Sequence, residues 1–374
     1  MPNKQCDKAI RILHVLGGLK RGGAESFVMN LYRSVDREKI QFDFVIHTKD
    51  HGDFYDEIIA LGGNVYHCPR YVGHNHFSYK RWWRKFLKNH PEYRVVHSHV
   101  RSTAAIYLKM AKKMGRVTIS HSHSTSSGKG IASIAKNVMQ YPIRHIADYL
   151  FACSLESGIW LFGKKAVHSE RFKVLKNVID LDKCSFNPAI RAQYREEMNL
   201  EDKTVFIHVG RLHPAKNHSF LLSLFKEVQK DNPKALLLIV GDGELKSEIE
   251  SLISELDLDA CVEMLGSRGD VDNLLQVADC FLFPSLWEGV PLTVIEAQAA
   301  GLPCFVSDKV TEDVAVSELV TRLPIDNGIF EWVKCISSSE LVRKDVSSKI
   351  VEAGYDAKRL AYLLTIFYTG KLEE

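Results

Sequence analysis

Short runs of β-branched and aromatic residues alternate with longer amphipathic segments along the whole chain. The short runs end at Gly, Pro, Asp or Ser, a pattern typical of buried strands, and the segments between them are long enough to form helices. Strands that alternate with helices form parallel sheets from βαβ units. We therefore predict an α/β fold with doubly wound sheets, in which ligands bind at the carboxyl ends of the strands.

The strand pattern divides into two series, which predicts two domains at residues 1–175 and 176–350. Residues 351–374 are expected to form a terminal helix, because four apolar positions between Tyr355 and Tyr368 recur at helical spacing. A crossover is expected between Phe172 and about Glu201. The predicted strands are Ile10–Leu16, Phe42–His47, Asn64–Cys68, Val95–His99, Val117–His121 and Tyr149–Ser154 in the first series, then Thr204–Val209, Ala235–Val240, Cys261–Leu265, Cys280–Phe283 and Cys304–Val306.

Composition narrows the class of protein. The 374 residues are 45% hydrophobic and 25% charged, as in globular proteins, and no apolar run approaches the roughly 18 residues that span a bilayer. The eight cysteines are scattered without a C-x-x-C pair, so we expect reduced, buried thiols rather than a disulfide scaffold. The first residues carry no signal-peptide pattern, and Pro2 stands where myristoylation requires glycine. A cytoplasmic location is therefore expected.

The net charge of +3 conceals an uneven distribution. Residues 1–175 contain 28 basic and 13 acidic side chains, whereas residues 176–374 contain 21 and 33. Histidine is also uneven, with 13 of the 16 in the first half. Such asymmetry suggests two domains that face different partners. Nucleic acid is not an expected partner of the basic half, because no recognised binding module or basic-aromatic strand platform is present.

Glycines follow the first predicted strand. The segment 17–26 (GGLKRGGAES) precedes a helical run that starts at Phe27. Glycines at such a turn let backbone N–H groups approach an anion, and the helix N-terminus favours negative charge. The segment matches neither G-x-G-x-x-G nor the P-loop pattern, which argues against nicotinamide binding and nucleoside-triphosphate hydrolysis. A plain tight turn is the alternative.

The second domain opens with a strand that ends in Gly210-Arg211 and continues to Lys216-Asn217. Arginine makes bidentate contacts to phosphate oxygens, and lysine supplies a mobile point charge. Together they suit a diphosphate leaving group. Two cations near a loop can equally be solvated surface.

The strongest local motif is the segment Phe283–Gly301 (FPSLWEGVPLTVIEAQAAG). Pro291 and the turn at Gly289 predict that Glu288 lies in a loop and Glu296 in the first turn of the next helix. Glu296 could form a capping box with Thr293, which needs no ligand. Alternatively, a carboxylate facing a crevice can bind a diol such as a ribose. The same helix start would offer the N–H groups of Leu292 and Thr293 to an anion.

Two His-Ser-His triplets, His97–His99 and His121–His123, close successive predicted strands. Paired histidines can bind zinc. No Asp, Glu or Cys accompanies them at ligand spacing, so we do not expect a metal. A neutral histidine that contacts a substrate hydroxyl, or a purely structural histidine, is the favoured interpretation.

The segment Lys80–Lys88 (KRWWRKFLK) places Trp82 over Phe86 and Trp83 over Leu87 at i,i+4, with cations on both flanks. Such a helix could lie on an anionic membrane surface. An ordinary helix that buries its aromatic residues against the sheet is the favoured alternative.

Taken together, Gly22–Glu25, Gly210-Arg211 with Lys216-Asn217, and Pro284–Gly301 resemble the retaining family 4 glycosyltransferases. The resemblance implies the GT-B fold, in which two Rossmann-like domains face a central crevice and the terminal helix crosses back to the first domain. Ala152–Ser154, Trp160–Gly163 and Asn177 are similar to the subgroup that builds bacterial exopolysaccharide or capsule.

The resemblance implies roles for the matched residues. Glu296 would hold the ribose hydroxyls, Glu288 would contact the transferred sugar, and His121 would position that sugar. Arg211 and Lys216 would stabilise the leaving diphosphate in place of a metal, so neither metal nor other cofactor is expected. The implied catalytic set is His121, Arg211, Lys216 and Glu288, and the implied donor-binding set is Gly22, Gly23, Gly210, Ser267, Arg268, Gly289, Leu292, Thr293 and Glu296.

The implied reaction is transfer of a sugar from a nucleoside diphosphate, with UDP expected, to a hydroxyl of a saccharide or polyprenyl-diphosphate-linked acceptor, with retention of configuration. Peripheral contact with the inner face of the plasma membrane is expected through Lys80–Lys88. The chain departs from the family at Asn177-Val178, where Asn-Gly is usual, and at 307–313, which replaces a glycine-rich stretch. A glycoside hydrolase or phosphorylase, a nucleotide-sugar epimerase and a non-catalytic nucleotide-sugar-binding protein remain as alternatives.

Overall fold

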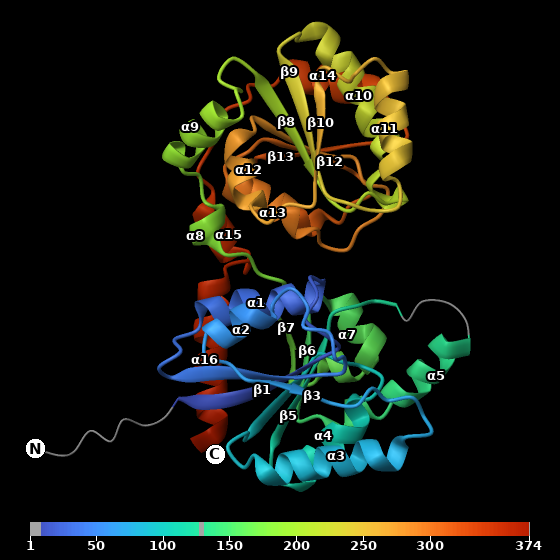
Figure 1. Ribbon diagram of the computed structural model, residues 1–374, viewed down its shortest axis with the longest axis vertical. Helices are drawn as coiled ribbons and strands as arrows, with labels where there is room; N and C mark the ends of the chain where they lie inside the picture. The colour runs from blue at the N-terminus through green and yellow to red at the C-terminus, as the bar shows by residue number, and fades with distance from the viewer. Residues whose placement is uncertain (1–8, 127–130, 374) are drawn as a thin grey trace, which may run out of the picture. The chain divides into compact units, whose positions relative to one another are not determined.

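The computed structural model describes residues 9–126 and 131–373, and this part of the chain forms two compact units (Figure 1). Unit 1 comprises the chain up to Val178 together with Ala357 onward, and unit 2 comprises Ile179–Asp356. The divisions lie a few residues after the predicted 175 and 350. Among the described residues, no helix combines the length and apolar character that crossing a bilayer requires.

Unit 1 contains a parallel sheet with the strand order β3-β2-β1-β4-β5-β6-β7. Helices cover both of its faces. The strands are β1 (Ile10–Leu16), β2 (Ile40–Ile46), β3 (Val65–His67), β4 (Val95–Ser98), β5 (Val117–Ser122), β6 (Tyr149–Ala152) and β7 (Phe172–Val174), and the helices are α1 (Gly23–Ser34), α2 (Tyr55–Ala60), α3 (His76–Asn89), α4 (Ala104–Lys113), α5 (Ile131–Gln140), α6 (Ile143–Ile146), α7 (Leu155–Phe162), η1 (Ala166–His168) and α16 (Ala357–Glu373).

Unit 2 repeats this architecture with the order β10-β9-β8-β11-β12-β13, again parallel throughout. Its strands are β8 (Thr204–Val209), β9 (Ala235–Val240), β10 (Val262–Gly266), β11 (Cys280–Phe283), β12 (Cys304–Ser307) and β13 (Val320–Leu323), and its helices are α8 (Leu181–Cys184), α9 (Pro188–Glu197), η2 (Pro214–Lys216), α10 (His218–Asp231), α11 (Lys246–Glu255), α12 (Val271–Val277), α13 (Leu292–Ala299), η3 (Glu312–Val314), α14 (Ile329–Ser337) and α15 (Ser347–Glu352).

Every predicted strand is present, and the bounds of β1, β8, β9 and β11 match the prediction. Two strands were not predicted, β7 and β13. The segment Phe172–Val174 is therefore an edge strand of unit 1, so the expected crossover starts after it rather than at Phe172.

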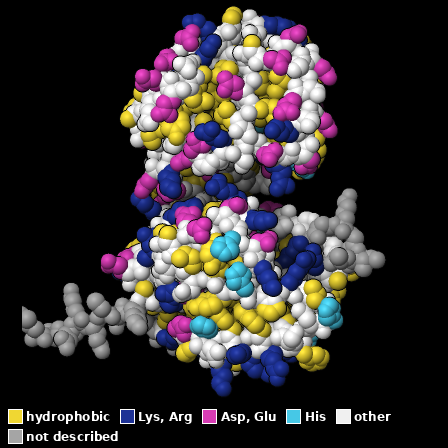
Figure 2. All heavy atoms as spheres, in the orientation of Figure 1, with side chains coloured by type: hydrophobic (Ala, Val, Ile, Leu, Met, Phe, Trp, Pro, Cys, Tyr) yellow, Lys and Arg dark blue, Asp and Glu magenta, His cyan; other side chains and the backbone are white. Residues whose placement is uncertain are grey.

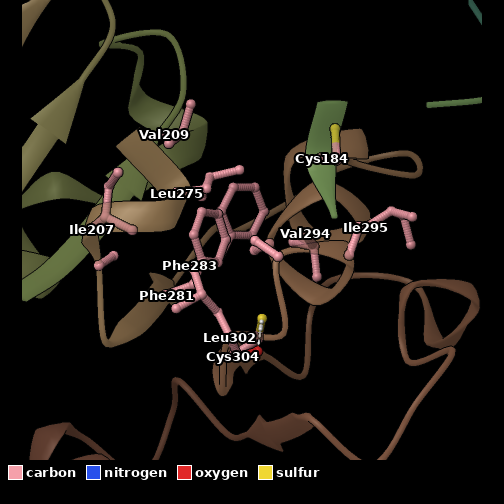
Figure 3. Packing of buried hydrophobic residues seen from close by; sticks show 14 of the residues in the cluster. Cys184, Ile207, Val209, Leu275, Phe281, Phe283, Val294, Ile295, Leu302 and Cys304 are labelled. Atoms are coloured by element: carbon pink, nitrogen blue, oxygen red, sulfur yellow. Dashed lines mark hydrogen bonds between the residues drawn. The ribbon is translucent and has the colours of Figure 1, made fainter. Parts of the chain in front are cut away.

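Both sheets are covered by helices on both faces, and apolar strand residues pack against these helices on each face. In unit 2, Phe281 and Phe283 of β11 point to the face covered by α8, α12, α13 and α15, where they pack with Val294 of α13 (Figure 3). The alternate residue Leu282 points to the opposite face, which α10, α11 and α14 cover. This period of two is the expected pleat of a strand. The pleat therefore determines to which face of the sheet the last side chains of each strand point.

The terminal helix α16 belongs to unit 1. Leu360, Leu364 and Tyr368 pack in the same hydrophobic cluster as Phe27 of α1 and Phe42 of β2. These three positions follow the i, i+4, i+8 spacing of one helix face. The helix therefore covers the sheet face that α1 also covers.

The chain passes between the units twice, at adjacent places. Ile179 forms a parallel bridge with Asp356, and its N–H donates to the carbonyl of Tyr355 at 2.8 Å. On the unit 1 side, Val178 and Ala357 are both buried in one cluster. Neither Asn177 nor Val178 has a positive φ, so this junction requires no glycine.

Each sheet has one point where the strand order reverses. In unit 1 it lies between β1 and β4, and in unit 2 between β8 and β11. Loops at the carboxyl ends of such strands diverge and leave room for a ligand. The structure thus marks one candidate position in each unit.

Candidate active site

An ion pair joins the two loops at the switch point of unit 2. Lys216 ends η2, which follows β8, and Glu288 lies in the loop after β11. Lys216 Nζ is 2.8 Å from Glu288 Oε1, and the side chains are only 13% and 21% exposed. The ammonium also lies 4.3 Å from the centre of the Phe283 ring, a cation–π contact. The sequence-predicted Lys216 and Glu288 are therefore brought together.

Close backbone packing holds the Lys216 loop. A Cβ on Gly210 would lie 2.6 Å from Lys216 Cε, and a Cβ on Gly241 would lie 1.9 Å from the Gly210 carbonyl oxygen. Gly241 has φ of 144°, which L side chains rarely adopt. In addition, the Leu286 N–H donates to the Ala215 carbonyl at 2.8 Å, tying one loop to the other. Gly210 thus packs against the Lys216 side chain, and its predicted donor contact stays a prediction.

Arg211 differs from Lys216 in being exposed. Within the described ranges its guanidinium has neither an ion pair nor a hydrogen bond to protein. It follows β8 directly, at the carboxyl edge of the sheet. A planar guanidinium in this position is available for bidentate contact with an anion.

The start of α13 corrects one interpretation of the sequence. Its N-cap is Pro291, and no side chain caps it. Thr293 lies inside the helix, and Glu296 lies one position beyond its first turn, so the two do not form a capping box. In the described part of the chain, the Thr293 and Ser285 hydroxyls are buried without a hydrogen-bond partner. Buried polar atoms without partners are uncommon and indicate a place where a ligand or water belongs.

Glu296 is partly buried. Burial, with a smaller contribution from the nearby carboxylate of Asp272, raises its pKa to about 7. Its carboxylate forms no hydrogen bond or ion pair to the described residues. A carboxylate that is costly to ionise and has no internal partner is suited to accept hydrogen bonds from a bound hydroxyl.

The other predicted donor residues of unit 2 lie at the same edge of its sheet. Gly289 and Leu292 flank Pro291 before and at the start of α13. Ser267 and Arg268 follow β10, and the Arg268 guanidinium is exposed and bonded to Asp270 at 2.7 and 2.8 Å. Arg268 is thus already paired, unlike Arg211.

In unit 1, the glycine-rich loop follows β1 and leads into α1. Gly22 is the N-cap of α1 and Gly23 its first residue, with no side chain capping the helix. Nothing lies within 4 Å of a Cβ placed on Gly23. The loop itself is fixed, because the Phe54 N–H donates to the Leu19 carbonyl and the Arg21 N–H to Asp53. This helix start presents N–H groups, and the Glu25 carboxylate lies beside them, since a Cβ on Gly22 would be 2.6 Å from Glu25 Oε2.

Histidines converge below this loop. His14 of β1 joins the two predicted triplets, and its Nδ1 is 3.0 Å from His99 Nε2. His99 Nδ1 is in turn 2.8 Å from His123 Nε2. His97 contacts the Tyr368 hydroxyl of α16 at 2.8 Å. We define the histidine cluster as His14, His97, His99, His121 and His123.

His14 was missed because one histidine in an apolar strand gives no signal of its own. Only the register, in which His14 lies directly beside His97, reveals the contact. Burial lowers the pKa of all five imidazoles, in His123 to about 3. The cluster is therefore neutral at physiological pH.

The predicted sugar-positioning residue, His121, is buried. Its ring packs edge-on against Phe27 of α1, with centroids 4.9 Å apart. His123 of the same triplet lies closer to the surface and is only partly buried. The role of His121 stays a prediction, and His123 is the ring of this triplet that faces more solvent.

Helix α3 resolves the two interpretations of Lys80–Lys88. Trp83, Phe86 and Leu87 are buried in the core of unit 1, and Trp82 stacks on Phe86 with centroids 5.0 Å apart. The aromatic residues therefore do not form a membrane-inserting face. Within Lys80–Lys88 the exposed residues are all basic, namely Arg81, Arg84, Lys85 and Lys88. Lys and Arg side chains gather along the lower edge of unit 1 (Figure 2).

The seven cysteines in the described ranges are all free. Cys6 lies outside the described residues.

Chemically, unit 2 presents an exposed guanidinium, a lysine held by a carboxylate, an uncapped helix start with an unpartnered hydroxyl, and a carboxylate with a raised pKa. The first three are groups suited to an anion, and the last is suited to accept hydrogen bonds from hydroxyl groups. Unit 1 presents the N–H groups of a helix start and, in its neighbouring strands, neutral imidazoles.

Comparisons with known proteins agree with this arrangement. Residues 190–344 match the family model for glycosyl transferases group 1, and residues 21–183 match the model for glycosyltransferase family 4. EpsF of Bacillus subtilis (strain 168), classed among the glycosyltransferases, is 34% identical over 368 residues, which cover 96% of each chain. An Escherichia coli UDP-Gal:alpha-D-GlcNAc-diphosphoundecaprenol alpha-1,3-galactosyltransferase is 31% identical over 237 residues, 60% of each chain.

The fold matches solved structures over nearly its whole length. HepE of Anabaena, crystallised in complex with UDP, superposes with a TM-score of 0.75 at 18% identity. The match covers 97% of this chain and 100% of HepE. The prediction of two Rossmann-like domains of the GT-B type is confirmed.

Proposed function

The chain belongs to glycosyltransferase family 4, and from this premise we propose that it transfers a sugar from a UDP-sugar to a hydroxyl of a saccharide or polyprenyl-diphosphate-linked acceptor. The transfer retains the anomeric configuration and contributes to exopolysaccharide, capsule or other cell-surface glycan synthesis. The names of the relatives support the nucleotide and the acceptor class, since one relative uses UDP-Gal and a diphosphoundecaprenol-linked sugar and HepE was crystallised with UDP.

The observation that carries the proposal is the ion pair of Lys216 and Glu288, which joins the loops after β8 and β11 at the edge of unit 2 where Arg211 and the start of α13 also lie. Two cations, one exposed and one held by Glu288 at 2.8 Å, lie at the edge where α13 begins uncapped. The unpartnered Thr293 hydroxyl can donate to a phosphate oxygen. A diphosphate satisfies all three groups. A glycoside hydrolase has no use for such an anion site.

In the proposed reaction, the bond between the anomeric carbon and the diphosphate oxygen breaks while a bond to the acceptor oxygen forms. The acceptor proton passes to the departing diphosphate on the same face of the sugar. Arg211, Lys216 and the α13 N–H groups stabilise the negative charge that develops on the leaving group, which is the term that most often dominates catalysis. We expect the transfer to need no metal ion, because these groups supply the positive charge.

The carboxylates have separate tasks in this proposal. Glu296 accepts hydrogen bonds from the ribose hydroxyls, which suits a side chain with no internal partner. Glu288 contacts the sugar and releases Lys216 toward the diphosphate when the donor binds. Gly22 and Gly23 keep their predicted role of offering N–H groups to a diphosphate, and His121 keeps its predicted role of positioning the sugar.

The first experiment measures UDP release and product formation from UDP-sugars, with and without acceptor. Arg211→Ala should lower turnover about 100-fold or more, since removing one preformed charge contact typically has this effect. Its melting temperature should stay near that of the parent, because Arg211 is exposed. Lys234→Ala is the matched control, as this exposed lysine precedes β9 at the opposite edge of the sheet.

Equal turnover of Arg211→Ala and Lys234→Ala would contradict the assignment of the anion site. Epimerised nucleotide-sugar without an acceptor requirement would identify an epimerase, and binding without any turnover would identify a non-catalytic protein. The anomeric proton coupling of the product, measured by NMR, tests retention. An inverted product would refute that part of the proposal.

A polyprenyl-linked acceptor is held in a membrane. We therefore also propose that the protein contacts the anionic inner face of the plasma membrane from the cytoplasmic side. Within Lys80–Lys88, the exposed charged face of α3 is the part available for this task. Each cation near an anionic surface contributes about 1 kcal/mol at low ionic strength. Replacing Arg81, Arg84, Lys85 and Lys88 by Gln should therefore abolish pelleting with phosphatidylglycerol vesicles. Equal pelleting of the parent with neutral and anionic vesicles would reject the contact.

A further inference from the structure

The helix α5 of unit 1 has its apolar side turned outward. Ile134, Val138 and Tyr141, at and just beyond its end, are 64%, 69% and 56% exposed. Ser133 and Gln140 of the same helix are buried instead, at 8% and 4% exposure. A helix that covers a core normally shows the reverse arrangement, with polar residues outside. The outer face of α5 is therefore suited to contact with something apolar.

The three exposed apolar residues lie on one helix face. Beyond the end of α5, the Tyr141 N–H donates to the Asn137 carbonyl at 3.2 Å, so residue 141 continues the helical path. Positions 134, 138 and 141 are then related as i, i+4 and i+7, which is the spacing of one face. The Arg144 guanidinium lies 4.4 Å from the centre of the Tyr141 ring and places a cation beside this face. We define the α5 stripe as Ile134, Val138 and Tyr141.

The α5 stripe lies in a strongly basic part of the chain. Residues 58–147 contain 15 Lys or Arg side chains and one acidic residue, Glu92. They supply the helices α3, α4 and α5, and α4 contacts both of the others. Lys109 and Lys113 of α4 are exposed, as are the four cations of α3. The stripe is therefore accompanied by positive charge on the neighbouring helices.

The other face of the same sheet differs in charge. Residues 23–57, which include α1, contain eight acidic and four basic side chains. The helices α1 and α16 cover that face, and Leu363 and Ile366 of α16 are each 52% exposed. Exposed apolar residues thus occur on both sides of unit 1. At α5 they coincide with an excess of positive charge.

We propose that the α5 stripe inserts into the headgroup region of an anionic lipid membrane while the cations of α3 and α4 bind lipid phosphate groups. An interfacial helix buries its apolar face at the boundary of head groups and acyl chains, and anionic lipids attract the cations around it. Tyrosine suits this depth because its ring is apolar and its hydroxyl is polar. A symmetric contact with a second copy of the chain would instead bring two basic surfaces together.

This inference rests on the membrane contact proposed above and gives that contact an inserting element, which α3 does not supply. Three apolar side chains form a small inserting surface, and the attraction of surface cations is screened by salt. Stable attachment of a peripheral protein generally requires two such signals together. The cations bring unit 1 to the membrane, and the stripe makes the attachment resistant to salt.

The test uses the full chain and vesicles of phosphatidylglycerol and phosphatidylcholine, without nucleotide-sugar or acceptor. Combining Ile134→Ser with Val138→Ser should weaken partitioning into these vesicles about 10-fold or more, because apolar side chains no longer contact acyl chains. It should also remove the bound fraction that the parent keeps at about 0.5 M salt, where charge attraction is largely screened.

The matched control combines Leu363→Ser with Ile366→Ser. It removes two exposed apolar residues from α16, on the less basic side of unit 1, and should bind vesicles as the parent does. Both double variants should melt near the temperature of the parent, because the replaced side chains are exposed.

A fluorescence measurement locates the stripe in the bilayer. Val138→Trp adds an indole to α5, and the added emission should shift to shorter wavelength and be quenched by lipids that carry bromine on their acyl chains. Leu363→Trp adds an indole to α16 and should show neither change. These measurements need no donor or acceptor, so a parent without transferase activity would contradict the proposed function and not this inference.

Three results would overturn the proposal. One is equal salt-resistant binding by the two double variants. Another is an indole at position 138 that responds to vesicles no more than the indole at position 363. The third is a parent that self-associates in sedimentation through the stripe without binding vesicles, which would identify a second copy of the chain as the partner.

Discussion

The carboxyl edges of the two sheets occupy the same place in the same topology and carry opposite chemistry. In unit 2 the strands β8 and β11 deliver cations and carboxylates, with Lys216 and Glu288 paired at 2.8 Å. In unit 1 the strands β1 and β4 deliver neutral imidazoles beneath a glycine loop. The topology thus determines where a ligand can bind, and the last few residues of each strand determine which ligand it is.

The two edges also differ in how tightly they are built. The loop after β8 is packed backbone against backbone at Gly241, whereas the loop after β1 has free space at Gly23. A preorganised charge site benefits from such rigidity.

The largest expected effect is a loss of stability when the close backbone packing at the unit 2 edge is disturbed. Gly241→Ala places a Cβ 1.9 Å from the Gly210 carbonyl oxygen at an unfavourable φ, so we expect a loss of about 3 kcal/mol or more in the free energy of unfolding. Gly23→Ala, with nothing within 4 Å, should change it by less than about 0.5 kcal/mol. Urea denaturation of both variants measures the contrast. Similar losses would mean that the two loops are equally constrained.

The next effect concerns the lysine that follows the first strand of each unit. A double-mutant cycle with Lys216→Met and Glu288→Gln should give a coupling free energy of about 1–2 kcal/mol, because the pair is largely shielded from water. The corresponding pair in unit 1, Lys20 and Asp50, is 3.8 Å apart and 77% and 67% exposed. Its cycle should give less than about 0.5 kcal/mol. Equal coupling energies would show that shielding does not distinguish the edges.

The third prediction concerns Glu296, whose pKa is raised from 4.5 to about 7 in the folded protein. The unfolded chain loses this proton at lower pH than the folded protein, so ionisation destabilises the fold as pH rises from 4.5 to 7. Glu296→Gln should therefore stabilise the UDP-free protein at pH 8 by on the order of 2 kcal/mol, and by little below pH 4.5. Melting curves across this range measure the difference. A pH-independent difference would assign the effect to packing instead.

Glu296→Gln also tests whether Glu296 contributes to UDP binding at the unit 2 edge. If Glu296 accepts hydrogen bonds from the ribose, Glu296→Gln should weaken UDP binding about 10-fold while it stabilises the free protein. Calorimetric titration measures the affinity. Unchanged affinity would remove Glu296 from the donor site.

The smallest expected effect concerns a helix start whose N–H groups are capped by side chains of the protein. In unit 1, α7 begins with a capping box in which the Ser157 N–H donates to Ser154 Oγ and the Ser154 N–H donates to Ser157 Oγ. Ser154→Ala should cost about 1 kcal/mol in unfolding free energy and leave UDP affinity unchanged. Ser247→Ala, on the exposed start of α11, should cost less than about 0.5 kcal/mol. Weaker UDP binding by Ser154→Ala would place this helix start in the donor site.

Much of the fold could be predicted because buried parallel strands are short, apolar and well delimited. The two strands that were missed are edge strands with charged residues, Lys173 in β7 and Arg322 in β13. An edge strand has one neighbour and less burial, so its sequence is under weaker apolar constraint. An edge strand of this kind is recognised only from its pairing with the neighbouring strand in the structure.

The site was predicted in part. Arg211, Lys216 and Glu288 were singled out by the family motifs, since charged residues after a strand can equally be solvated surface, and the structure brings Lys216 and Glu288 together. His14 was not found, since its significance depends on the register between β1 and β4. The supposed capping box failed because Pro291 sets the start of α13 earlier than Thr293 suggested. The spacing of Trp82, Trp83 and Phe86 could not distinguish burial from exposure, because both place apolar side chains on one helix face.

The paired crossings at Val178–Ile179 and Asp356–Ala357 have a consequence for biosynthesis. Unit 2 is one uninterrupted stretch of chain, so it can fold as soon as Asp356 has left the ribosome. Unit 1 starts earlier but lacks α16 until the residues after Ala357 emerge, and its core face around Phe42 stays uncovered until then. The domain translated first is therefore completed last. During that interval the nascent chain exposes an apolar sheet face, which is where we expect a chaperone to bind.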